Sequence, residues 1–321
     1  MSPKCSVYMS ALIAVCTRGE DFKRQCRAEG MLELCMEQAA LAVPECALQG
    51  TPATSASPQL ACSTLGDLSN RSVHQVVSLV KAIVSGDDST ATVSKAFDHA
   101  REVVGSKVAA VYTLASSCIS SAMADPAGTG VPPIVKECVS LLRCLAVNDS
   151  ICVQFTDDGA LQLLTSVAEK YPKHAPTIRN VCGAIKKLAH SDHVKRAVCA
   201  GDAKPLSVLL SGLQGFMTDA SVVEQALAAL SVSVLRTPEN AQMVADKDAL
   251  PFIAKAMQMH PDAAGLQRQA CLCVRNLVSR SKSSLTEPLL EEGVEALLRA
   301  AKASHPACQD VAKAALRDLG F

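Results

Sequence analysis

Basic residues at matching positions of one short pattern are the strongest chemical signal in this sequence. The pattern reads apolar, basic, any residue, apolar, and its cations are Lys81, Arg143, Lys186, Arg275 and Arg317, with Lys187 beside the third. Cations gathered on one side of a molecule can bind carboxylates or phosphates through charge-assisted hydrogen bonds. The same long side chains can instead reach into water from the edge of a buried stripe, or pair with local Asp and Glu. Which role they have depends on the elements that carry them.

The remaining residue groups that could do chemistry are weak. The glycine-rich phosphate loops, the nucleophile elbow and the H-E-x-x-H zinc motif are all missing. Cys182, His190, His193 and Cys199 form a metal-like cluster, but Cys182 belongs to an apolar stretch and both histidines to a polar turn. We therefore expect no enzyme activity, no cofactor and no bound metal.

Composition narrows the class of protein. The 321 residues include 31 Lys+Arg and 31 Asp+Glu, and they are 49% hydrophobic but only 3% aromatic, without Trp. A disordered chain is excluded, and zero net charge argues against a general binder of nucleic acid or membrane surfaces. No apolar run is long enough to span a membrane. Ala, Leu, Val and Cys must fill the interior, which favours closely packed helices.

The cysteines point to a reducing compartment. Fifteen is an odd number, the spacing is irregular and no CxxC pair occurs. Free thiols are the simpler interpretation in a chain of this length. Lys4 precedes an apolar run that could pass for a secretory signal, but no small-residue cleavage site follows it. The expected location is the cytoplasm, and the nucleus is a second candidate location.

The elements that must position the cations repeat along the chain. A sixth copy of the pattern, Leu230-Ser231-Val232-Ser233, lacks the charge, and successive second positions are 62, 43, 45, 44 and 42 residues apart. Four of these intervals match three-helix repeats of about 40 to 47 residues. Corners at Gly159, Asp248 and Gly293 separate short helical patterns, and a glycine there favours a left-handed turn. Each unit reads as two short helices and a longer third helix that carries the basic pattern.

These residues resemble the armadillo repeat. Val274-Arg275-Asn276-Leu277 keeps the asparagine of the armadillo groove, and the stretches from His260 to Val278 and from Asp310 to Gly320 resemble the C-terminal part of the armadillo repeat-containing protein 6 family. That family implies an intracellular, non-enzymatic protein. The expected fold is all-α, a right-handed armadillo-type solenoid of about six three-helix repeats. We expect one domain, 1–321, with an inserted loop at 44–57.

The resemblance implies that third helices face a concave groove. The sequence then predicts a scaffold that binds an extended acidic or phosphorylated protein segment, with a partner-binding groove of Lys81, Arg143, Lys186, Lys187, Arg275, Asn276 and Arg317. The alternative is an importin-like transport adaptor with basic cargo, which needs an acidic groove lined by Trp and Asn.

The start of the chain resembles the tail of a repeat. Residues 1–18 read as a third helix without the helices that would come before it. The apolar side of this segment would lack a covering unit, since solenoids usually need a polar capping repeat. We therefore expect self-association, or contact with a missing upstream segment, through residues 7–41.

Overall fold

The structure, a computed structural model, describes residues 77–78, 81–82, 108–124, 130–200, 204–279 and 282–321. Within these ranges every regular element is a helix, as predicted, and none is long and apolar enough to cross a membrane. The chain divides into two units, Met1–Leu163 and Leu164–Phe321. The predicted loop at 44–57 and the predicted self-association segment at 7–41 lie outside the described residues.

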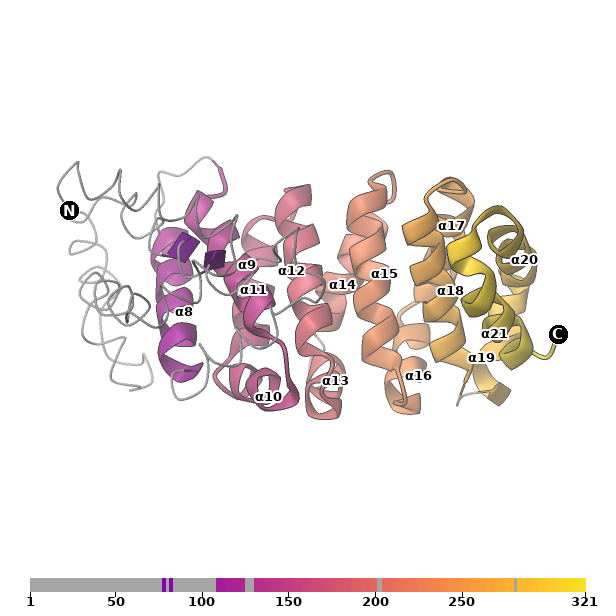
Figure 1. Cartoon of the computed structure of the whole chain (residues 1–321), viewed down its shortest axis with the longest axis horizontal. Helices are drawn as coiled ribbons and strands as arrows, with labels where there is room; N and C mark the ends of the chain where they lie inside the picture. Colours follow the sequence, from indigo (N-terminus) through magenta and orange to yellow (C-terminus); the bar gives the residue numbers. More distant parts are fainter. Residues whose placement is uncertain (1–76, 79–80, 83–107, 125–129, 201–203, 280–281) are drawn as a thin grey trace, which may run out of the picture. The chain divides into compact units, whose positions relative to one another are not determined.

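The first unit contains α8 (Val108–Ala124), α9 (Pro133–Leu145) and α10 (Asp149–Asp157) (Figure 1). α8 packs against both α9 and α10. Tyr112 of α8 and Phe155 of α10 place their ring centroids 5.9 Å apart, so two of the few aromatic residues form part of this contact. Asn148 starts α10, because its side chain accepts a hydrogen bond from the N–H of Ile151. α11 (Ala160–Lys170) crosses the boundary between the units.

The second unit continues with triplets of helices. It contains α12 (Ala175–Leu188), then α13 (Asp192–Cys199), α14 (Lys204–Gly215) and α15 (Ala220–Val234), then α16 (Pro238–Asp246), α17 (Ala249–Met259) and α18 (Ala264–Val278), and last α19 (Lys282–Glu291), α20 (Val294–Ser304) and α21 (Gln309–Leu319), with a short 3-10 helix, Pro306–Cys308, before α21. The predicted sequence of two short helices and a longer third helix is confirmed for the α13–α15 and α16–α18 triplets.

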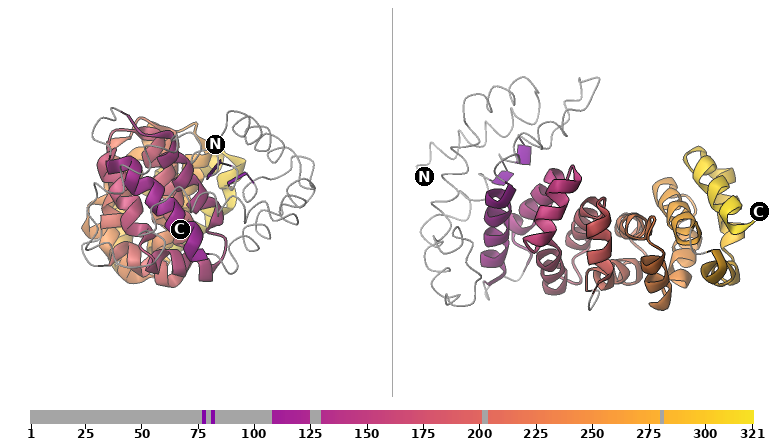
Figure 2. Two further views of the ribbon diagram at one scale, coloured as in Figure 1. Left: turned by 90° about the vertical axis from the view of Figure 1, so that its left-hand side faces the viewer. Right: turned by 90° about the horizontal axis from the view of Figure 1, so that it is seen from below.

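The third helices of the second unit, α12, α15, α18 and α21, pack side by side in that order (Figure 1). Neighbours on both sides bury all residues in the middle of α15, from Ala226 to Ser231. The first helices α13 and α16 lie at the lower edge of Figure 1, so they face the reader in the right-hand view of Figure 2. Each apolar stripe is thus covered by the next repeat, which is the packing of a solenoid.

The corners between first and second helices have the predicted backbone. Gly159 has φ +98° and Gly293 has φ +72°, the left-handed region in which glycine is unstrained. Asp248 occupies the equivalent corner before α17 with φ +54°, a conformation that Asp tolerates better than most residues. The prediction of a left-handed glycine corner is confirmed at Gly159 and Gly293, and Asp248 adopts the same conformation.

Candidate partner-binding surface

Five of the predicted cations lie in helices of the described residues, each in the last turn. Arg143 ends α9 in the first unit, Lys186 and Lys187 end α12, Arg275 ends α18 and Arg317 ends α21. A cation in this turn favours the helix because it faces the negative end of the dipole. Part of the periodicity therefore has a structural cause, independent of any partner.

Three of these cations have carboxylate partners within the protein. In the first unit, Lys81 Nζ lies 2.8 Å from Glu137 Oε2. In the second unit, Asp318 takes two cations: its Oδ1 lies 2.8 Å from an Nη of Arg317, and its Oδ2 lies 3.6 Å from Nε of Arg275. Glu137 and Asp318 therefore neutralise part of the positive charge that the predicted cations carry.

Asn276 is engaged with the neighbouring repeat. Its Nδ2 donates to the main-chain oxygen of Ser231 at 2.9 Å and to the Ser231 hydroxyl at 3.0 Å. Both amide hydrogens are used, so holding a partner's backbone would require Asn276 to break these bonds or to accept through Oδ1 alone.

Asp318 and Asn276 occupy the same position of their repeats, directly after the cation. Each reaches back to the cation position of the preceding third helix, which is Arg275 for Asp318 and Ser231 for Asn276. One repeat position thus ties consecutive third helices together through polar contacts.

Two further arginines share the exposed side of the third helices. Arg179 and Arg268 stand seven residues before Lys186 and Arg275, which is two turns earlier on the same helix face, and both are exposed. The equivalent positions on α15 and α21 hold Glu224 and Asp310. The sequence pattern missed this second row because it followed one position per repeat. A comparison of positions two turns upstream would have found it.

A buried lysine joins neighbouring first helices. Lys195 of α13 is 1% exposed, and its Nζ lies 2.6 Å from Asp192 Oδ1. An Nη of Arg236 lies 3.2 Å from the same oxygen. The two cations hold the pKa of the Asp192 carboxyl below its ordinary value, chiefly through the hydrogen bond from Lys195. Asn240 of α16 donates to the main-chain oxygens of Lys195 and Ser233.

The described cysteines carry free thiols, and all but Cys144 are buried. Burial raises the pKa of Cys182 and Cys273 to about 12. In the metal-like cluster, Cys182 and Cys199 are buried whereas His190 and His193 are exposed. Within the described ranges no three His, Cys, Asp or Glu side chains are grouped as a metal site would require.

Comparison with known sequences gives a partial match. No family model matches the chain. Human armadillo repeat-containing protein 6 is 29% identical over 122 residues, and the orangutan (Pongo abelii) protein of the same name is 30% identical over 121 residues. Each match covers 35% of this chain and 24% of the relative. The chain therefore spans about a quarter of the length of these relatives.

Comparison with solved structures covers nearly the whole chain. A designed armadillo repeat protein aligns with a TM-score of 0.60 and 19% identity, over 87% of this chain and all of that one. A structure of the interaction between cadherin and β-catenin aligns with a TM-score of 0.64 and 12% identity, over 97% of this chain and 52% of that one. At this identity the likeness concerns the fold. Together with the helix triplets, it shows that the chain has the all-α fold of an armadillo-type solenoid, and the partial sequence match makes the chain similar to armadillo repeat-containing protein 6.

Proposed function

We propose that the protein is a non-catalytic scaffold that binds an extended acidic or phosphorylated segment of a partner protein. The armadillo-repeat fold supports protein binding in general. The observation that carries the finer proposal is the charge on the third-helix face, by which we mean the exposed side of α12, α15, α18 and α21. Its cations are Arg179, Lys186, Lys187, Arg268, Arg275 and Arg317, and its carboxylates are Glu224, Asp310 and Asp318. Cations outnumber carboxylates on this face two to one.

Apolar side chains stand between the charges. Val232 of α15, Leu272 of α18 and Val311 of α21 are half-buried, so each third helix keeps part of an apolar side chain exposed. An exposed ion pair contributes only about 0.2 to 1 kcal/mol, so affinity must come from several such pairs together with apolar anchors. An extended segment can meet both, because successive third helices present equivalent positions to it.

In the cadherin–β-catenin structure, a phosphorylation switch controls the interaction between the two proteins. It therefore provides a precedent, in a structure of similar fold, for an interaction that phosphorylation controls. The importin-like alternative has less support, because it requires an acidic groove with free asparagines. Here the face is basic, and Asn276 donates both amide hydrogens to Ser231. Free thiols support a reducing compartment, and we place the protein in the cytoplasm.

Charge reversal on the third-helix face tests the proposal. We expect a fluorescein-labelled peptide of alternating Glu and phosphoserine to bind, with an affinity that falls as salt rises from about 50 to 300 mM. The double variant Lys186→Glu, Arg268→Glu should weaken binding about tenfold or more, mainly through the association rate.

The matched control is Lys255→Glu, Lys302→Glu, which makes the same change of net charge at exposed positions on the second helices α17 and α20. Fluorescence anisotropy measures affinity, and circular dichroism confirms that each variant folds. Equal loss of binding in both double variants would show that net charge, and not this face, attracts the peptide.

A further inference from the structure

A histidine links neighbouring repeats at two equivalent loops of the second unit. The Nε2 atom of His260, directly after α17, lies 2.7 Å from the main-chain oxygen of Met217 in the preceding repeat. The Nε2 atom of His305, directly after α20, lies 2.7 Å from the main-chain oxygen of Pro261. The loops between second and third helices are therefore joined by the same imidazole–carbonyl hydrogen bond at consecutive junctions.

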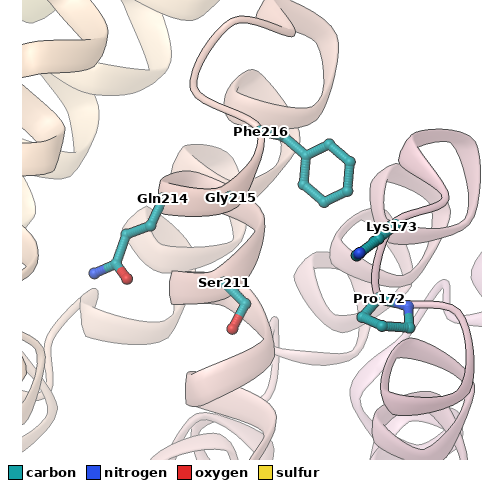
Figure 3. Close-up of a pocket in the computed structure, with 6 residues that line it drawn as sticks. All are labelled: Pro172, Lys173, Ser211, Gln214, Gly215 and Phe216. Atoms are coloured by element: carbon teal, nitrogen blue, oxygen red, sulfur yellow. The ribbon is translucent and has the colours of Figure 1, made fainter.

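The junction before these two lacks the link. Phe216 follows directly after α14 and stands 44 residues before His260, so it holds the position of the two histidines. A phenyl ring has no N–H to donate. Each histidine lies 43 or 44 residues after the residue whose main-chain oxygen it bonds. The same separation from Phe216 leads to Lys173 or Pro172, and both belong to the loop after α11. Figure 3 shows the Phe216 ring directed towards these two residues.

A pocket of about 590 Å³ lies at this junction, lined by Pro172, Lys173, Ser211, Gln214, Gly215 and Phe216. The pocket is a depression that is largely open to solvent, so it can contact one or two side chains of a partner without enclosing them. The pocket lies within the second unit, and its residues are not those of the third-helix face.

The walls of the pocket define the chemistry of its occupant. Phe216 is half-buried and Pro172 is exposed, so their rings offer an apolar wall. Lys173 is exposed, and no carboxylate of the described residues lies within ion-pair distance of its ammonium. The last turn of α14, with Gln214 and Gly215, lines the pocket. Main-chain carbonyls in the last turn of a helix lack a partner inside the helix and can accept N–H donors. These carbonyls are the negative end of a helix dipole, so a negative group of the occupant must lie at Lys173, away from the end of α14.

We propose that this pocket binds a peptide segment of a partner protein in which an acidic residue stands next to an aromatic one. The carboxylate pairs with Lys173, the aromatic ring packs against Phe216 and Pro172, and the peptide N–H groups donate to carbonyls at the end of α14. The segment thus occupies a junction at which no histidine bonds a loop carbonyl of the preceding repeat, as His260 and His305 do at the next two junctions.

Nuclear magnetic resonance of the full chain, labelled with ¹⁵N, tests the proposal with the capped dipeptide acetyl-Glu-Phe-amide. We expect saturable shifts of the Gly215 and Phe216 amides, with a dissociation constant in the range of about 1 to 10 mM. Acetyl-Gln-Phe-amide and the variant Lys173→Ala should each weaken binding about threefold to fivefold, as the loss of one exposed ion pair predicts. Lys255→Ala, an exposed lysine on α17, is the matched control and should leave the affinity unchanged.

The variant Phe216→His adds a second readout, the melting temperature, which does not depend on the probe. It should restore the imidazole–carbonyl link, raise the melting temperature and abolish dipeptide binding. The complementary variant His260→Phe should lower the melting temperature. The proposal is overturned if no saturable shift occurs at these amides, if inorganic phosphate shifts them equally, or if Phe216→His leaves both melting temperature and binding unchanged.

Discussion

Lys195 is among the largest fully buried side chains, yet its partner Asp192 is 57% exposed. Two changes at this pair should have unequal effects on stability. Lys195→Met removes a buried charge and keeps the volume, so we expect the free energy of unfolding to stay within about 1 kcal/mol of the parent or to rise. Asp192→Asn leaves the buried Lys195 ammonium without its counter-ion and should lower the free energy of unfolding by about 1 to 2 kcal/mol. The loss is limited to this size because Asp192 is 57% exposed, so water weakens its attraction to the ammonium. Urea denaturation measures both, and equal losses would contradict this account.

The same carboxylate predicts a pH dependence. The pKa of Asp192 is lower in the folded protein than its ordinary value of 3.8. Its stabilising contribution is therefore complete above pH 3.8 and is lost as the pH falls through the folded-state pKa. The stability difference between the parent and Asp192→Asn should be constant near neutral pH and should shrink below this value. Urea titrations at several pH values check this, and a difference that grows on acidification would refute it.

Asn240 is buried, and its amide donates to Lys195 O at 2.9 Å and to Ser233 O at 2.8 Å. Asn240→Ala would leave two buried carbonyl groups without this donor. We expect a loss of about 2 to 4 kcal/mol in the free energy of unfolding. Gln242→Ala on the same helix, where the side chain bonds only the exposed Asp246, is the control and should change stability by less than about 0.5 kcal/mol. Comparable losses for the two variants would show that the cross-repeat bonds carry little stability.

At the scale of elements, α14 meets α12 at a glycine. A Cβ at Gly212 would lie 3.2 Å from Cys182 Sγ and 3.3 Å from a methyl carbon of Ile178, so the two helices approach too closely for a larger side chain. Gly212→Val should destabilise the protein by about 1 to 3 kcal/mol through overpacking. Gly215→Ala, where nothing lies within 4 Å of an added Cβ, should be neutral or slightly stabilising. Thermal unfolding of both variants checks the contrast, which would disappear if α14 could shift away from α12.

The sequence predicted the elements well because they depend on local patterns. The basic pattern fell in the third helices, and the corners at Gly159 and Gly293 adopted the expected conformation.

At the scale of the whole molecule, the reactivity of the buried thiols measures how readily the folded structure opens. Cys182 and Cys273 are buried and have pKa values of about 12, so almost none of either is thiolate at neutral pH. We expect both to react with N-ethylmaleimide only as fast as the structure opens, and Cys144, which is half-buried, to react earlier. Timed labelling followed by peptide mass spectrometry gives the order. Early labelling of Cys182 in native buffer would mean that the second unit opens readily.

The candidate site was less predictable than the fold. The sequence placed Arg275 and Arg317 on third helices but could not show that they share Asp318, because that contact depends on how far one repeat is offset against the next. The pocket beside Phe216 was also missed. Its signal was present as an aromatic residue where later repeats have His260 and His305, and only the hydrogen bonds of those histidines reveal what the position does.

The polar contacts between repeats join residues 43 to 45 apart in sequence, as in Asn276 to Ser231 and His260 to Met217. This spacing makes the second unit sensitive to chain length. One residue inserted within α18 before Asn276 would rotate its side chain by about 100° and separate it from Ser231. A whole repeat duplicated at a junction would leave each donor facing an equivalent acceptor. Such a protein can grow or shrink by complete repeats, whereas within a repeat it has room for insertion only in its loops.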